Sequence, residues 1–188
     1  MNRPFFCIFA SYTALRFVLE SFIKPRTGFR PEGARKDRGI LSLAILTAAH
    51  IFSNFVVCRI LFLDPSAVTA FRFIPGTAFC AAGFAGRIAA LRALGKAYSL
   101  FMVPAEGSGL VTHGIYSKIR HPIYAFYLLE MAGFFIIFPG LETFVSFFAV
   151  CSATVYRVEK EEALLERFYG DAFRIYKKST KKLVFFIY

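Results

Sequence analysis

The sequence has few charged residues and few cysteines for a chain of its length. Only 19% of its 188 residues are charged and 57% are hydrophobic, whereas a soluble domain averages about 25% charged and about 45–50% apolar residues. Its 4 cysteines are scattered in apolar surroundings and form no C-x-x-C pair. This pattern excludes a disulfide framework and favours small buried side chains. The composition indicates a membrane protein, and we expect no metal site.

Two sequence signatures of nucleotide and nucleic-acid binding are also missing. The glycines Gly76, Gly83 and Gly86 lie in an apolar stretch rich in alanine, with no preceding strand and no G-x-G-x-x-G pattern. Small residues at such spacing instead allow membrane helices to approach closely. No module combines basic with aromatic residues, so the net charge of +11 is not attributed to nucleic-acid binding. The expected partner is the lipid bilayer, whose anionic headgroups attract basic segments.

Apolar segments long enough to be candidate transmembrane helices follow one another along the chain. A span needs about 20 predominantly apolar residues, and the candidates are Phe5–Ile23, Ile40–Leu63, Ala67–Leu91, Ile123–Phe138 and Leu141–Tyr156. Arg16 and Glu20 interrupt the first segment, which argues against a cleaved signal peptide, and they lie four residues apart, as a pair on one helix face would. Only Pro139 and Gly140 separate the last two segments, which predicts a tight hairpin. The sequence therefore predicts an all-α, polytopic membrane helical bundle of about five transmembrane helices.

Basic residues predict the orientation of this bundle. Residues 24–38 contain six Lys or Arg, residues 87–120 contain five, and residues 157–182 contain eight. With five spans these segments all lie on one side, and Arg3 alone lies on the other. The positive-inside rule then predicts an external N-terminus and a cytoplasmic C-terminus. The short chain favours a prokaryotic source, and hence a location in the cytoplasmic membrane.

A polar run that ends abruptly at an apolar segment, "GIYSKIRHPIYAFY" (residues 114–127), is the first candidate site. Pro122 suits the first position of a helix, and the residue before it, His121, is biased to the extended geometry of an N-cap. Backbone N–H groups, the helix dipole and the His ring would converge there on an anion. Arg157 and Glu161 share a face of the last long helix if it continues beyond Tyr156, and Glu161 would accept hydrogen bonds from an ammonium group. The helix start at His121 and Pro122, together with Glu161, suits a ligand with both a carboxylate and an amine, although anchoring at the membrane interface explains each piece as well.

The order and spacing of these motifs carry a family resemblance. "GLVTHGIYSKIRHPIY", about 30 residues of hairpin, and "RVEKEEALLERFYGDAFRIY" resemble the isoprenylcysteine carboxyl methyltransferase family, which is related to the phospholipid N-methyltransferases. The resemblance covers Leu94 to Leu183 and implies methyl transfer from S-adenosylmethionine at a cytoplasmic cofactor site. It divides the chain into N-terminal membrane spans (residues 1–93) and a catalytic methyltransferase region (residues 94–188).

The resemblance also assigns roles to individual residues. The residues implied to bind S-adenosylmethionine are Leu110, Val111, Tyr116, His121, Pro122, Ile123, Tyr124 and Glu161. Arg157 would face the methyl acceptor and is a catalytic candidate together with Glu162. Tyr116 and Tyr124 would also contact the positively charged sulfur through cation–π attraction.

The identity of the acceptor is left open by the sequence. A carboxylate needs only a cationic partner such as Arg157, whereas an amine must lose a proton, with Glu162 or His113 assisting. The expected acceptor is a lipophilic or lipid-tailed molecule that enters from the bilayer. A phospholipid-type N-methyltransferase, a membrane reductase with a nicotinamide cofactor, and a non-catalytic membrane protein are the alternatives. A further intramembrane carboxylate, Glu130, is expected to pair with Arg16, Arg59 or Arg72 rather than to act in catalysis.

Overall fold

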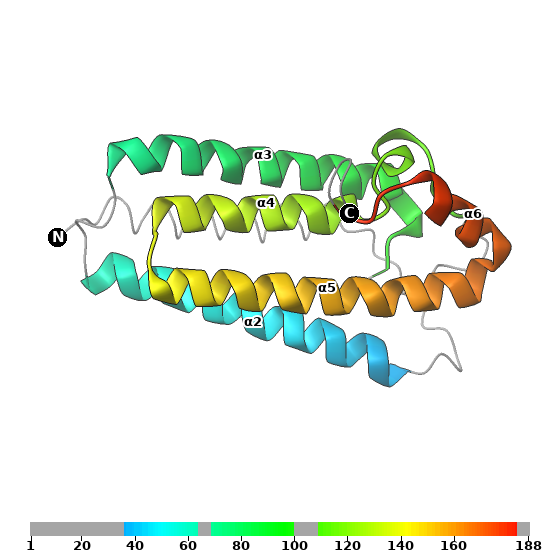
Figure 1. The fold of residues 1–188 in the computed structure, drawn as a ribbon, viewed down its shortest axis with the longest axis horizontal. Coiled ribbons are helices and arrows are strands. Elements are labelled where there is room, and N and C mark those ends of the chain that lie inside the picture. Colours follow the sequence, from blue (N-terminus) through cyan, green and yellow to red (C-terminus); the bar gives the residue numbers. More distant parts are fainter. Residues whose placement is uncertain (1–35, 64–68, 100–108, 184–188) are drawn as a thin grey trace.

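The computed structural model describes residues 36–63, 69–99 and 109–183, most of which are helical (Figure 1). In chain order the elements are α2 (Lys36–Leu63), α3 (Ala70–Leu94), the short 3-10 helices η2 (Gly95–Ala97) and η3 (Gly114–Ser117), α4 (Pro122–Ile137), α5 (Leu141–Tyr169) and α6 (Asp171–Ser179). These ranges include no strand, only an isolated bridge between Ile119 and Lys181. The predicted all-α class is confirmed for this part of the chain. The predicted first span, Phe5–Ile23, lies outside the described residues.

The four long helices form two antiparallel pairs that lie side by side. α3 packs along α4, and α2 packs along α5, with all four running along the long axis of the molecule (Figure 1). This arrangement brings the start of α2, the end of α3, the start of α4 and the second half of α5 to the same end, which also carries α6. Each pair joins a helix from the first half of the sequence to one from the second half, and the division between residues 93 and 94 stays a prediction.

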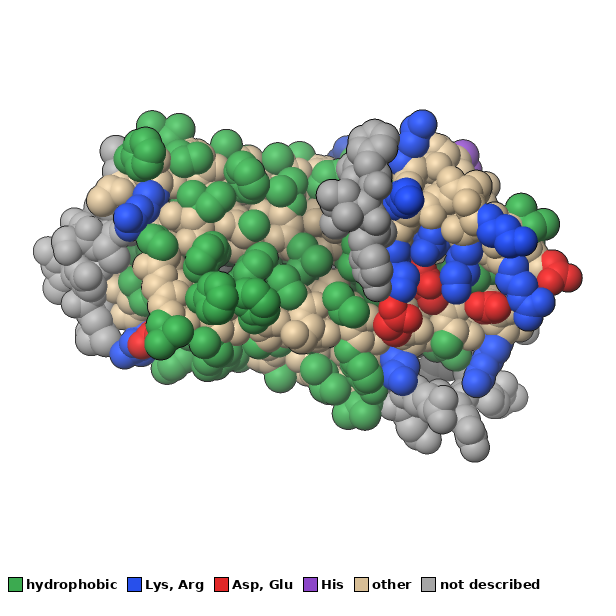
Figure 2. Space-filling model, viewed as in Figure 1, with side chains coloured by type: hydrophobic (Ala, Val, Ile, Leu, Met, Phe, Trp, Pro, Cys, Tyr) green, Lys and Arg blue, Asp and Glu red, His purple; other side chains and the backbone are tan. Residues whose placement is uncertain are grey.

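Three helices of the described part are long and apolar enough to cross a membrane. They cover Leu41–Leu61, Phe71–Ala97 and Leu141–Tyr169, and α4 is an apolar helix of 16 residues. Figure 2 shows hydrophobic side chains over the length of the bundle, whereas Lys, Arg, Asp and Glu side chains gather at the α6 end. Phe71 is 88% exposed and Leu141 is 78% exposed, as expected where lipid rather than water covers the surface. The predicted membrane character is confirmed, and the gathering of basic side chains at one end agrees with the predicted asymmetry.

Glycines allow α3 and α4 to approach each other closely, as the sequence predicted. A Cβ atom on Gly83 would lie 2.6 Å from the backbone nitrogen of Glu130 and 2.7 Å from the carbonyl oxygen of Phe126. A Cβ atom on Gly133 would lie 2.6 Å from the carbonyl oxygen of Gly76. Because backbone atoms occupy these positions, the two helices can pack at this separation only without side chains there.

The hairpin predicted at Pro139 and Gly140 is confirmed. α4 ends at Ile137 and α5 begins at Leu141. The hydroxyl of Thr143 donates a hydrogen bond to the carbonyl oxygen of Phe138, an acceptor that the turn leaves outside both helices, whereas the carbonyl oxygen of Gly140 accepts the first intrahelical bond of α5 from the N–H of Phe144 at 2.9 Å. Phe135 of α4 stacks on Phe147 of α5, with ring centroids 5.9 Å apart, so the two helices of the hairpin pack against each other.

The intramembrane carboxylate Glu130 has a partner that the sequence did not single out. Its side chain is completely buried, and Oε2 lies 3.5 Å from Nη1 of Arg87 in α3. Arg59 instead pairs with Glu142 at the hairpin end, and Arg16 lies outside the described residues. Arg87 lies within the apolar segment predicted for the third span, and α3, which extends to Leu94, keeps it buried. The predicted pairing of Glu130 with Arg16 stays a prediction.

Candidate active site

α4 begins where its sequence predicts. Pro122 is the first residue of the helix and His121 is its N-cap residue, but the backbone of His121, with φ −122° and ψ 57°, is not in the extended conformation that was predicted. The N–H groups in the first turn of a helix have no acceptor within the helix. The carbonyl oxygen of His121 already accepts the first intrahelical bond, from the N–H of Ala125 at 3.0 Å. The amides of Ile123 and Tyr124 therefore lie at a helix N-terminus that favours an anion.

α5 continues past Tyr156 without a break, as predicted, and carries Arg157 and Glu161 one turn apart. Tyr124 of α4 connects them: Arg157 Nε donates to its hydroxyl at 2.8 Å, and the hydroxyl donates to Glu161 Oε2 at 2.8 Å. The Arg157 side chain is buried, whereas Glu161 and Tyr124 are partly exposed. A cation, a phenol and a carboxylate thus form one hydrogen-bonded chain beside the start of α4.

α2 contributes a residue to this chain that the sequence did not single out. Arg157 Nη1 donates a hydrogen bond to the hydroxyl of Ser42 at 3.2 Å, and both side chains are buried. Tyr98, just after η2, also lies near, since the charges of Arg157 and Glu161 both act on its pKa, which burial raises most. A hydroxyl in the otherwise apolar "ILSLAIL" segment was a possible signal for Ser42, but a membrane helix often carries one without a function.

The predicted residues His121 and Glu162 meet on another side of α5. Glu162 is 4% exposed and its Oε1 lies 2.9 Å from Arg120 Nε and 3.3 Å from His121 Nε2. Lys177 of α6 approaches Oε2 to 3.4 Å. The His121 ring therefore faces Glu162, and the helix amides rather than the ring are directed to an anion at α4. Glu161 and Glu162 therefore lie in different surroundings.

The loop before α4 brings the other predicted residues to the same end of the bundle. Tyr116 is buried and its hydroxyl donates to the carbonyl oxygen of Ala90 at 3.3 Å. Burial raises the pKa of Tyr116, and the nearby carboxylate of Glu161 raises it further, so the phenol remains a hydrogen-bond donor. Leu110 and Val111 are partly exposed, and His113 is exposed.

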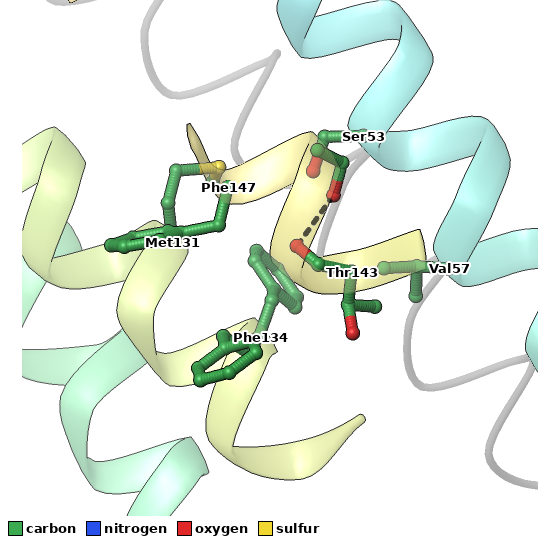
Figure 3. Close-up of a pocket in the computed structure, with 8 residues that line it drawn as sticks. Ser53, Val57, Met131, Phe134, Thr143 and Phe147 are labelled. Carbon is green, nitrogen blue, oxygen red and sulfur yellow. Dashed lines mark hydrogen bonds between the residues drawn. The ribbon is translucent and has the colours of Figure 1, made fainter. Parts of the chain in front are cut away.

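A separate cavity lies in the hairpin half of the bundle, between α2, α4 and α5 (Figure 3). Ser53 and Val57 of α2, Met131 and Phe134 of α4, and Thr143 and Phe147 of α5 line it together with Phe135 and Ser146. The hydroxyl of Ser146 donates to the carbonyl oxygen of Thr143 at 2.9 Å. With a volume of about 10 Å³, the cavity holds about one water molecule. It is too small for a cofactor or an acceptor.

Comparison with known families assigns the region around the site to a family. Residues 71–172 match the phospholipid methyltransferase family, and this match covers more than half of the 188 residues. The chain belongs to the phospholipid methyltransferase family. No curated protein sequence matches it significantly. The predicted resemblance to a membrane methyltransferase family is confirmed at this level, whereas the narrower assignment to the carboxyl methyltransferases stays a prediction.

The region shared with the phospholipid methyltransferase family contains every residue that the sequence placed in the site. It begins in α3 and ends just inside α6. Ser42 and α2 precede it, and Tyr176 and the residues after α6 follow it. Among the described residues, no group of three His, Cys, Asp or Glu side chains is arranged to hold a metal ion.

Proposed function

We propose that this protein is an integral-membrane methyltransferase that uses S-adenosylmethionine and methylates a lipophilic acceptor. The observation that carries the proposal is the hydrogen-bonded chain Arg157–Tyr124–Glu161 beside the N-terminus of α4. It combines, at one end of an apolar bundle, groups for an amine, for a carboxylate and for a second anion. Membership of the phospholipid methyltransferase family supports the reaction class.

The chemistry of these groups fits the amino-acid end of S-adenosylmethionine. Glu161 has a partly exposed carboxylate, which would accept hydrogen bonds from the amine, and the amides at the start of α4 would donate to the carboxylate. The residues proposed to hold the cofactor are Leu110, Val111, Tyr116, His121, Pro122, Ile123, Tyr124 and Glu161. When bound, the cofactor supplies a methyl group on a positively charged sulfur, which no side chain provides. The protein then needs to orient the acceptor and exclude water.

Arg157 is the proposed partner of the acceptor. Its guanidinium is held by Tyr124 through Nε and by Ser42 through Nη1, so its position is fixed before any ligand arrives. The planar, permanently charged guanidinium of an Arg binds a carboxylate or phosphate oxygen better than the ammonium group of a Lys would. We therefore propose carboxyl methylation of a lipid-tailed acceptor as the first candidate reaction. A carboxylate is already a nucleophile, and this reaction asks for no general base.

N-methylation of a phospholipid is the second candidate, and the family match fits it equally well. In this case Arg157 would contact the phosphate group of the acceptor rather than the reacting nitrogen. The ammonium group must first lose a proton. Glu162 is predicted to assist, although its contacts with Arg120, His121 and Lys177 stabilise its charged form and leave it a weak base.

The position of the hydrogen-bonded chain Arg157–Tyr124–Glu161 supports entry of the acceptor from the bilayer. Ser42 and Arg157 lie where α2 and α5 pack together at the α6 end of the apolar bundle. A molecule with a lipid tail is already dissolved in the membrane at this depth, so its headgroup reaches the site without leaving the bilayer. The predicted external N-terminus and cytoplasmic C-terminus place this end at the cytoplasmic surface.

The test is turnover with labelled S-adenosylmethionine and two defined acceptors. Purified protein in vesicles is incubated with either phosphatidylethanolamine or N-acetyl-S-farnesylcysteine, and label in the lipid extract is counted. Base-labile label in the farnesylcysteine fraction indicates a methyl ester, whereas base-stable label in the phospholipid indicates N-methylation. If the protein binds a reduced nicotinamide cofactor but not S-adenosylmethionine, the reductase alternative is supported. If it binds neither cofactor, a non-catalytic protein is supported. Either result would refute the proposed function.

A further inference from the structure

The segment after α6 turns back along the loop that precedes α4. The N–H of Lys181 donates to the carbonyl oxygen of Lys118 at 3.1 Å. The N–H of Arg120 donates to the carbonyl oxygen of Lys181 at 2.8 Å. The N–H of His121 donates to the carbonyl oxygen of Lys182 at 3.1 Å. We call residues 176–182 the C-terminal clasp. Its backbone fixes three residues immediately before the first turn of α4.

Arg120 connects the C-terminal clasp to α5. Its Nη1 donates to the carbonyl oxygen of Lys177 at 3.1 Å and also to that of Thr180. Its Nε donates to Glu162 at 2.9 Å, and its side chain is 8% exposed. A guanidinium has its donors in a rigid fork. This one side chain therefore sets the relative positions of α5, the clasp and the residue before His121.

The clasp also holds Tyr116, another residue that is predicted to bind the cofactor. The hydroxyl of Tyr176 donates to the carbonyl oxygen of Tyr116 at 2.6 Å, and both residues are buried. Burial raises the pKa of Tyr176, so its hydroxyl keeps its proton and remains a donor. Residues 116–121 are thus bonded to the clasp at both ends.

The clasp lies outside the part of the chain that matches the family, which ends at residue 172. None of the residues that the sequence assigned to cofactor or acceptor belongs to it. Its contacts go mainly to backbone groups of the loop and to Arg120. A segment that bonds the backbone of a binding loop without contributing to the site acts on the position of the loop.

We propose that the C-terminal clasp positions the loop 116–121 and the first turn of α4 for cofactor binding, with Arg120 and Tyr176 as positioning residues. This inference rests on the proposed function, because the ligand of the loop is S-adenosylmethionine. The clasp orders the loop in advance, so the ligand does not have to order it on binding. Loosening the clasp weakens cofactor affinity but leaves the groups that carry the chemistry in place.

Two single substitutions and one control test the clasp in the full-length protein. Tyr176→Phe keeps the ring and removes only the hydroxyl that bonds Tyr116. Arg120→Lys keeps the charge beside Glu162 but has no fork to bond both clasp carbonyls. Arg174→Gln is the control, because Arg174 lies on the exposed face of α6 and pairs there with Glu166 and Asp171.

Two readouts are measured: hydrogen exchange of residues 114–125, and S-adenosylmethionine affinity with kcat and KM. Tyr176→Phe should speed exchange in this segment and raise the Kd and KM for the cofactor by roughly threefold to tenfold, as the loss of about one hydrogen bond allows. The kcat at saturating cofactor and the melting temperature should change little. Arg120→Lys should have the larger effect on affinity, and Arg174→Gln should have none.

The outcomes separate the clasp from the proposed function. If wild-type protein binds the cofactor and Tyr176→Phe changes neither exchange nor affinity, the clasp inference is overturned and the proposed function stands. If wild-type protein does not bind S-adenosylmethionine, the proposed function fails and the cofactor role of the clasp fails with it. Should Arg120→Lys not fold, Tyr176→Phe alone still decides, because it removes a single oxygen atom.

Discussion

Arg157 of α5 and Tyr124 of α4 are joined by a hydrogen bond of 2.8 Å from Nε to the phenolic oxygen. This bond links α5 to the first turn of α4. Because the same hydroxyl donates to Glu161, the proposed acceptor group and the proposed cofactor group share Tyr124 as a common contact.

Tyr124→Phe should weaken both halves of the site at once. The substitution keeps the ring but removes the oxygen that accepts from Arg157 and donates to Glu161. Bonds to charged groups contribute about 1.5–3 kcal/mol each, so we expect S-adenosylmethionine affinity to fall roughly tenfold and turnover to fall further. Calorimetry and an initial-rate assay measure the two effects. Tyr156→Phe is the control, since Tyr156 lies on an exposed face of the same end of the bundle, and equal behaviour of the two variants would argue against a role for Tyr124.

Glu162→Ala should lower the stability of the protein. It leaves Arg120 and His121 buried and without the carboxylate that contacts them, and removing one partner of a buried pair costs about 3–5 kcal/mol. A clear drop in melting temperature in detergent should result, measured by intrinsic fluorescence or scattering. Glu166→Ala is the matched control, because Glu166 is a partly exposed residue on the same helix. A Glu162→Ala protein with an unchanged melting temperature would contradict this account.

Gly83→Ala should disrupt the packing of α3 on α4. The added Cβ would lie 2.6 Å from a backbone atom of Glu130, and backbone atoms cannot move aside as the end of a side chain can. Overpacking of this kind costs about 1–3 kcal/mol or more. We expect a lower melting temperature and poorer yield than for Ala82→Leu, which adds more atoms at an exposed position of the same helix. Equal stability of the two variants would mean that the helices do not approach as closely as described.

Arg87 and Glu130 should be energetically coupled. Glu130→Gln leaves the Arg87 cation buried next to a neutral group, and Arg87→Met leaves the carboxylate of Glu130 buried in the same way. Each single substitution should lower stability by about 3–5 kcal/mol, and the double substitution should cost less than the sum of the two. A double-mutant cycle in thermal or denaturant unfolding measures the coupling. Strict additivity would show that the two residues do not interact.

The sequence predicted those features that depend on local pattern. Apolar length and the Pro139-Gly140 turn gave the helices and the hairpin, Pro122 gave the start of α4, and helical spacing placed Arg157 and Glu161 on one face. These signals are contained in a few consecutive residues, because capping, turn formation and helix periodicity are local effects.

The remaining features depend on which segments become neighbours in space. Helical spacing does not say which helix faces Glu130, so Arg87 was not recognised as its partner. Nothing in the sequence around Ser42 indicates that α2 packs against Arg157. The bonds between residues 181–182 and the loop before α4 join backbone groups, and backbone groups are the same in every residue, so no side-chain pattern predicted them.

The most direct test of the account compares Arg157→Ala with Glu161→Ala by calorimetric titration of S-adenosylmethionine and by turnover. If Glu161 binds the cofactor and Arg157 serves the acceptor, Glu161→Ala should lose at least tenfold in affinity, as expected for a charge-assisted hydrogen bond. Arg157→Ala should keep its affinity within about threefold, because only the indirect contact through Tyr124 is lost, and should have no measurable turnover. Arg157→Lys should recover turnover only in part, since an ammonium group lacks the planar fork. Equal losses of affinity in the two alanine variants, or no binding by the wild-type protein, would contradict the account.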